Sequence, residues 1–169
     1  AATVRGYWRT LRRPRRILVV SHLYAPESFG GSEVVAELDA NGLRRKGYEV
    51  RVFCGRLDNG QPRYVLATRL DEDVVRVNLH MDDFQHLQRL NNRKPILERQ
   101  FARCVDIFQP DVVHFHNLYP LTAGLVNVCY RQRIPTLMTL HDYWPLCIKN
   151  VMLTNADEIC HHNGLNCFN

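Results

Sequence analysis

The chain has 169 residues, of which 46% are hydrophobic and 23% charged, a composition typical of one globular domain with one buried core. No segment approaches the ~20 consecutive apolar residues needed to span a bilayer. Six arginines and no acidic residue lie in residues 1–16, and their charge exceeds the +5 of the whole chain, so the rest is slightly acidic. Without a basic stripe or a nucleic-acid-binding motif in that remainder, we expect no nucleic-acid partner.

Residues 1–16 therefore form a basic N-terminal arm. Tyr7, Trp8 and Leu11 lie among its arginines, a mixture that suits an anionic membrane surface or a phosphorylated carrier. A solvated segment without a partner is the alternative. The apolar run that follows, residues 17–20, is too short for a signal peptide. We expect a cytoplasmic protein, with peripheral association at the inner membrane face as an option.

Strand-like and helix-like patterns alternate after the arm. Continuous Val, Ile and Leu runs predict buried strands, and apolar spacing of three to four residues predicts helices. Strands are predicted at 16–22, 48–54, 63–68, 73–80, 111–117 and 134–142, and helices at 32–47, 83–90, 95–109 and 121–133. This order predicts an α/β domain over residues 17–145, with a Rossmann-like, doubly wound parallel sheet. Residues 146–169 lack periodicity and are expected to form an irregular tail.

The loop between the first strand and the first helix contains Gly30 and Gly31, directly before Ser32. Residues without a Cβ let the backbone approach a ligand, and Ser32 is a plausible N-cap for the helix. Free N–H groups at a helix start favour an anion such as phosphate. The pattern is neither GxGxxG nor GxxxxGK[ST], so a dinucleotide site and a P-loop are not indicated, and a tight turn is an equal alternative.

Three segments in this order carry a resemblance to a known family: PESFGGSE at 26–33, PDVVHFHNLYP at 110–120 and IPTLMTLHDYWPLC at 134–147. Together they resemble the N-terminal half of family-4 retaining glycosyltransferases of the GT-B fold. This resemblance implies one half of a two-domain enzyme, in which a second, C-terminal domain holds the nucleotide-diphosphate sugar. It implies an acceptor that is a saccharide or lipid-linked, a role in polysaccharide biosynthesis, and no cofactor for catalysis.

The resemblance also implies roles for particular residues. Gly30 and Gly31 would contact the donor diphosphate, and His141 would be catalytic, reaching the transferred sugar. The cleft on the acceptor side would be lined by Glu33, His116, Asn117, Asp142 and Tyr143. Because the C-terminal domain does not follow within these residues, the chain alone is expected to be inactive unless that domain is supplied in cis or in trans.

Two other functions stay open at this point. His114 and His116 share one face of a predicted strand, and with His141, Asp142 and the pair His161–His162 they could build the metal site of a hydrolase. A buried His114 is more often a hydrogen-bonded core residue. A non-catalytic module that binds carbohydrate or a partner is the other alternative.

The six cysteines divide into two groups. Cys54, Cys104 and Cys129 fall in apolar patterns, where a thiol behaves as a small buried hydrophobe. Cys147, Cys160 and Cys167 lie in the tail near His161 and His162. Three thiolates and an imidazole would satisfy a structural zinc ion, with free thiols or a local disulfide as the alternatives.

Overall fold

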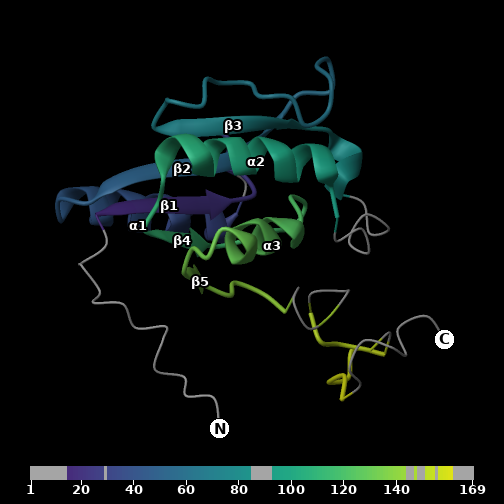
Figure 1. Cartoon of the computed structure of the whole chain (residues 1–169). Coiled ribbons are helices and arrows are strands. Elements are labelled where there is room, and N and C mark those ends of the chain that lie inside the picture. The colour runs from purple at the N-terminus through teal and green to yellow at the C-terminus, as the bar shows by residue number, and fades with distance from the viewer. Residues whose placement is uncertain are drawn as a thin grey trace, which may run out of the picture.

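A computed structural model describes residues 15–28, 30–84, 93–143, 147, 151–154 and 156–161. Figure 1 shows strands and helices that alternate along most of the chain. The elements are β1 (Arg16–Ser21), α1 (Gly31–Arg45), β2 (Glu49–Leu57), β3 (Val74–Leu79), a 3₁₀ turn (Met81–Phe84), α2 (Pro95–Phe108), β4 (Val112–Phe115), α3 (Gly124–Arg131) and β5 (Thr136–Met138). Residues 1–14 of the predicted arm and residues 85–90 of the helix predicted at 83–90 lie outside the described residues.

The strands form one five-stranded sheet in the order β3-β2-β1-β4-β5. All four neighbouring pairs are parallel, so every carboxyl end lies at the same edge. In Figure 1, α2 and α3 lie in front of the sheet and α1 lies behind it. The α/β class and the Rossmann-like, doubly wound parallel sheet are therefore confirmed. None of the described helices is long and apolar enough to cross a membrane.

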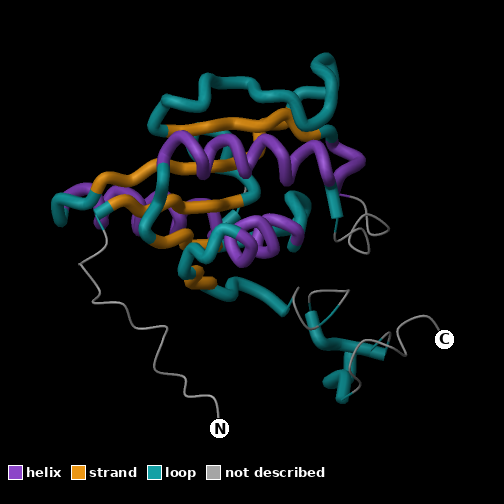
Figure 2. Tube along the Cα trace, in the orientation of Figure 1, coloured by secondary structure: helices purple, strands orange, loops and turns teal. Residues whose placement is uncertain are grey.

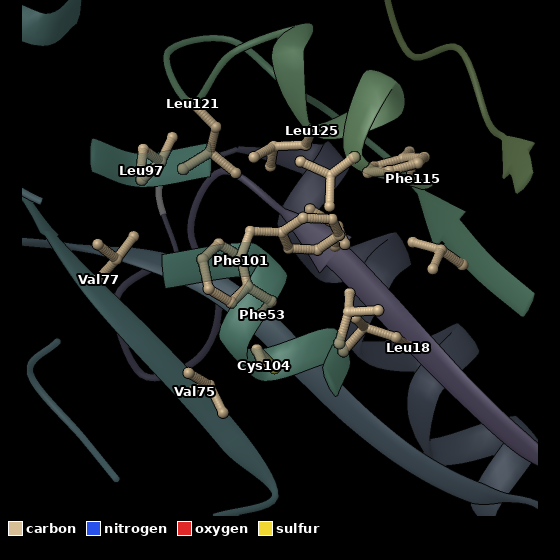
Figure 3. Close-up of a cluster of buried hydrophobic side chains, with 14 of the residues drawn as sticks. Leu18, Phe53, Val75, Val77, Leu97, Phe101, Cys104, Phe115, Leu121 and Leu125 are labelled. Atoms are coloured by element: carbon tan, nitrogen blue, oxygen red, sulfur yellow. The ribbon is translucent and has the colours of Figure 1, made fainter. Parts of the chain in front are cut away.

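The larger apolar core lies between the sheet and the helices α2 and α3, as Figure 3 shows. Phe101 of α2 is at its centre, with its ring 5.1 Å from Phe53 of β2 in an edge-to-face contact and 6.2 Å from Phe115 of β4. All three side chains are buried. Burial of one aromatic side chain of this size contributes roughly 1.5–3 kcal/mol, so this cluster is a main source of stability.

The core on the opposite face is smaller and lies under α1. Ala36 and Ala40 of α1 are fully buried against the strands, where they pack with Val19 and Val52. Short side chains at these positions let the helix lie close over β1 and β2. The register pairs Val19 with His114, so the histidines of β4 point to this same face, beside α1.

The strand predicted at 63–68 is wrong. Figure 2 shows loop between β2 and β3, and this segment makes only an isolated antiparallel bridge, between Leu66 and Val77. Backbone bonds from Tyr64 to Asn78 and from Ala67 to Arg76 hold it beside β3. Tyr64 has a positive φ of 59°, which breaks the extended conformation that a strand requires.

Candidate functional site

Histidines follow three neighbouring strands at the carboxyl edge of the sheet. His22 comes directly after β1, His116 directly after β4, and His141 three residues after β5. The His116 N–H donates to the Val20 carbonyl at 2.9 Å, which ties the end of β4 to the end of β1. This edge is where open α/β sheets bind ligands, so the sheet gathers the candidate residues in the expected place.

Glu33 and His22 form a buried pair beneath the glycine loop. The His22 Nε2 atom lies 3.0 Å from Glu33 Oε1, and the Glu33 side chain is only 2% exposed. The Ser32 hydroxyl donates to the other carboxylate oxygen at 3.0 Å. Glu33 thus points inward from the first turn of α1 and links the helix to the end of β1.

Burial controls the charge of His22. Its pKa lies below the usual 6.5, mainly because burial disfavours the imidazolium, while the negative charges of Glu33 and Asp142 oppose this effect. The carboxylate can only accept, so the neutral ring carries its proton on Nε2, which donates to Glu33. Asp142 acts on His22 through its charge, which places the end of the β5 segment near the same pair.

A glycine in β2 fixes the backbone of His22. The Gly55 N–H donates to the His22 carbonyl at 2.9 Å. A Cβ at position 55 would lie 2.5 Å from that oxygen and 2.3 Å from Leu79 Cδ1, far inside van der Waals contact. Only glycine allows this close approach, so Gly55, which comes directly after the strand predicted at 48–54, has a positioning role that the sequence pattern did not reveal.

His116 and His141 contact each other directly. The His116 Nδ1 and His141 Nε2 atoms are 3.1 Å apart, and the two rings stack with centroids 5.3 Å apart. Burial and the nearby His114 and His141 lower the pKa of His116 to about 4, while Asp39 acts in the opposite direction. The His116 ring is therefore neutral at pH 7.

His114 lies beside His116 on the face of the sheet that α1 covers. Their ring centroids are 4.2 Å apart, and His114 Nε2 is 2.8 Å from the Thr139 hydroxyl. Burial lowers the pKa of His114 as well. Asp39 of α1 approaches from the other side, with Oδ2 3.6 Å from His116 Nε2. His114 thus has a hydrogen-bonding partner of its own, as expected for a core histidine.

The glycine loop lies at the start of α1, as the sequence indicates, but its details differ. The helix begins at Gly31, and Gly30 is the N-cap with extended dihedrals of −145° and −178°. Ser32 is therefore inside the first turn, and its prediction as the N-cap is wrong because its hydroxyl bonds to Glu33 instead of a backbone N–H. A Cβ at Gly31 would meet nothing within 4 Å, whereas one at Gly30 would lie 3.2 Å from Glu33 Oε2.

The sequence profile of Glycosyltransferase Family 4 matches residues 29–163, well over half of the chain. This chain belongs to Glycosyltransferase Family 4. The matched region contains the glycine loop, Glu33, Asp39 and the histidines after β4 and β5, so the family assignment covers most of the candidate site.

Comparison with solved structures finds one described as "Trehalose-6-phosphate from E. coli bound with UDP-2-fluoro glucose". It is similar to this chain at 16% identity and a TM-score of 0.39, over 75% of this chain and 33% of that one. The family-4 chain thus spans about a third of that protein. No curated protein matches the sequence.

The remaining predicted cleft residues of the family-4 chain lie at the same edge of the sheet but differ in exposure. Asn117 is partly buried, and its Oδ1 accepts the Tyr119 N–H at 2.9 Å, so its side chain already shapes the loop after β4. Asp142 is partly exposed, and the Tyr143 side chain is 53% exposed. Tyr143 is therefore the more accessible of the two to a ligand.

A buried lysine bridges two loops at this edge. Lys94 Nζ lies 3.0 Å from Asp83 Oδ1 and donates to the Pro120 carbonyl at 2.7 Å. Burial alone would raise the pKa of Asp83, but hydrogen bonds from Tyr64 and the His80 N–H and the charge of Lys94 lower it overall. This network joins the loop after β3 to the loop after β4, and sequence patterns gave no sign of it.

The tail cysteines remain a prediction. Cys147 is buried and Cys160 partly buried, while Cys167 and His162 lie outside the described residues. Cys54, Cys104 and Cys129 are buried free thiols, as predicted, and burial raises the pKa of each to about 12. Within the described ranges, the side chains that could share a metal ion are Asp39, His114 and His116.

Sequence reasoning missed His22 and Asp39. His22 follows the first buried strand, in the same relation that identified His116 and His141, so the signal was present in the chain. Asp39 gives no such signal, because it reads as a solvent-facing residue of an amphipathic helix. Its place beside His116 depends on how α1 packs against the sheet.

Proposed function

We propose that this family-4 chain is the N-terminal domain of a retaining glycosyltransferase of the GT-B type. It would contribute acceptor binding and part of the active site for transfer of a sugar from a nucleotide-diphosphate sugar to a saccharide or lipid-linked acceptor. The family match over residues 29–163 carries this proposal. The convergence of His22, Glu33 and His141 at the carboxyl edge of the sheet supports it.

The start of α1 suits the departing diphosphate. The N-cap Gly30 has no side chain, so it leaves first-turn N–H groups for a ligand, and the helix dipole adds a partial positive charge there. Negative charge develops on the diphosphate as the sugar leaves, and fixed donors near that charge stabilise the transition state. Glu33 turns inward to His22, which keeps its carboxylate paired beneath the loop.

In this proposal His141 contacts the transferred sugar. Its ring is partly exposed at the carboxyl edge, and its Nε2 atom is held by the buried His116. A ring fixed on one side by a buried partner presents its other side in a defined orientation, which is what transition-state stabilisation requires. His116 therefore acts as a positioning residue for His141 in this proposal.

The donor would be held mainly by a C-terminal domain, supplied in cis or in trans. The chain alone should then bind UDP- and GDP-sugars weakly in calorimetry and transfer no sugar. The two-domain protein should transfer sugar to a saccharide or lipid-linked acceptor, with the anomeric configuration of the donor retained in the product by NMR.

Two results would overturn this proposal. Low-micromolar donor affinity of the isolated chain would show that no second domain is required for donor binding. Absence of transfer by the two-domain protein over a panel of nucleotide sugars and acceptors would favour a non-catalytic binding module.

A separate experiment tests the membrane surface. Binding of the two-domain protein to anionic vesicles, lost when the arginines of residues 1–16 are neutralised, would place the reaction at a membrane surface.

A further inference from the structure

The side chains of Asp39, His114 and His116 converge from α1 and β4. Their ligand atoms all lie within 4.8 Å of one another. His114 and His116 are two residues apart on one strand, so both point to the face covered by α1, where Asp39 meets them. Two imidazoles and one carboxylate are a donor set that zinc commonly takes in proteins.

The spacing of His116 and Asp39 is informative. His116 Nε2 is buried and has no hydrogen-bond partner, although Asp39 Oδ2 is only 3.6 Å away. That separation is too long for a hydrogen bond. Two ligand atoms bound at ~2.1 Å to the same tetrahedral zinc ion lie about 3.4 Å apart. The observed distance therefore fits two ligands of one metal ion better than it fits a direct contact.

The surroundings favour a bound cation. His116 is 1% exposed and His114 is 8% exposed, so both rings are held in place, while the Asp39 side chain is 46% exposed and leaves a route from solvent. Each histidine ring also has an outer hydrogen-bonding partner, His141 for His116 and Thr139 for His114. Such partners fix the orientation of metal-binding imidazoles.

We propose that Asp39, His114 and His116 form a binding site for a borderline divalent transition metal, with Zn²⁺ as the preferred ion. The two histidines and the carboxylate supply three ligands, and the exposed side next to Asp39 leaves a fourth position for water. The site is separate from the tail cysteines and does not depend on the proposed transfer reaction.

Metal at this site would also affect His141. When His116 Nε2 binds the ion, the ring keeps its proton on Nδ1 and donates it to His141 Nε2, 3.1 Å away. This fixes one tautomer of His116 and makes His141 Nε2 the acceptor. The site would thereby couple metal binding on the α1 face to the orientation of His141.

The test is Zn²⁺ titration of the tag-free, chelator-treated 169-residue chain by calorimetry, with Co²⁺ as a spectroscopic probe. All variants carry Cys147→Ser, Cys160→Ser and Cys167→Ser, so that zinc bound by the tail is not counted. We expect saturable Zn²⁺ binding and a tetrahedral Co²⁺ spectrum without a thiolate charge-transfer band. Saturating Zn²⁺ at a hundredfold excess over Kd should raise Tm by roughly 5–10 °C.

Asp39→Ala is the informative variant, because Asp39 is half-exposed and alanine suits a helix. It should weaken Zn²⁺ binding at least tenfold, because loss of a group that only hydrogen-bonds to a metal ligand already lowers metal affinity by tenfold or more. Glu37→Ala, on the same helix, is the matched control and should leave the affinity unchanged. His141→Ala should weaken binding by roughly 10–100-fold through His116.

Three outcomes would overturn the proposal. The chain without the three tail cysteines could fail to bind Zn²⁺ at all. Asp39→Ala and Glu37→Ala could bind it equally well. The Co²⁺ spectrum could show octahedral coordination, as expected for adventitious binding to surface carboxylates.

Discussion

The two faces of the sheet differ in what they bury. The face covered by α2 and α3 is closed by aromatic and aliphatic side chains around Phe101. The fully buried apolar side chains of the strands on the α1 face come from β1 and β2, and at the end of β4 this face presents His114 and His116 to Asp39. At the edge of this second face Leu137 of β5, which pairs with His114, is 56% exposed.

The two faces therefore have different roles within one domain: one stabilises the fold and the other carries the candidate functional residues. The α2 and α3 face excludes water and holds the strands together, so its residues act through packing. The α1 face carries neutral, buried imidazoles whose pKa values are lowered by burial, as functional sites often require. Substitutions on the first face should therefore change unfolding, and substitutions on the second should change binding, catalysis or pH dependence.

The largest expected effect lies on the packed face. Phe101→Ala removes a ring that contacts both Phe53 and Phe115 and leaves a cavity, so it should lower the free energy of unfolding by about 3–5 kcal/mol. Urea unfolding followed by circular dichroism measures this loss. Ile107→Ala on the same helix is the control, because Ile107 is 54% exposed and should change stability by under about 1 kcal/mol. Equal losses in both variants would contradict the division between the faces.

His141→Ala should have the next largest effect, and on catalysis instead of folding. In the two-domain enzyme we expect kcat/KM to fall by roughly a hundredfold, about 2.7 kcal/mol of transition-state stabilisation, with Tm nearly unchanged because the ring is partly exposed. Steady-state transfer kinetics and thermal unfolding measure the two quantities. His161→Ala, at an exposed residue of the tail, is the control. Near wild-type turnover in His141→Ala would place the reaction centre elsewhere.

His22→Gln should have a smaller effect, visible as a change in pH dependence. The pKa of His22 is lowered in the folded protein, so below pH 6.5 the unfolded chain binds more protons and stability falls on acidification. This contribution is fully present above pH 6.5 and is lost as the pH falls through the folded pKa. The variant should therefore show a shallower acid decline in unfolding free energy than the wild type. Parallel declines would show that His22 does not titrate as its burial indicates.

The smallest expected effect on stability is that of Gly31→Ala. A methyl group there meets nothing within 4 Å, so the free energy of unfolding should change by under about 1 kcal/mol, in the stabilising direction. The same methyl group should weaken donor binding by the two-domain enzyme, because it narrows the approach to the first turn of α1. Gly30→Ala is the matched variant, since its Cβ would press on Glu33 Oε2 at 3.2 Å. Unaltered donor affinity in Gly31→Ala would contradict a diphosphate at this loop.

Sequence patterns predicted the alternation of strands and helices because buried parallel strands are continuously apolar. β1, β2, β4 and the helices α1 and α2 lie where those patterns placed them, with ends that differ by a few residues. The strand predicted at 63–68 is wrong because Val65 and Leu66 are residue types typical of strands, whereas the positive φ of Tyr64 depends on contacts with β3. No local pattern contains that information.

Residues of the candidate site that lie at strand ends could be predicted from the sequence, and those positioned by tertiary packing could not. His116 and His141 come directly after apolar runs, so their meeting at one edge follows from a parallel sheet. The inward orientation of Glu33 depends on its contact with His22, and the position of Asp39 beside His116 depends on how α1 packs against the sheet. The need for glycine at position 55 arises from the close approach of the His22 backbone, which cannot be read from the sequence.

The short strand β5 has a practical consequence for work with this domain. Within the described part of the chain it is one of the two edge strands of the sheet and is three residues long, with the exposed side chain of Leu137 inside it and that of Leu140 just after it. An open strand edge with apolar neighbours is a template for pairing with another molecule, and its shortness limits that tendency without removing it. Self-association at high concentration would thus begin at β5, and Leu137→Lys, which places a charge on that edge, is the natural substitution for obtaining a monodisperse sample.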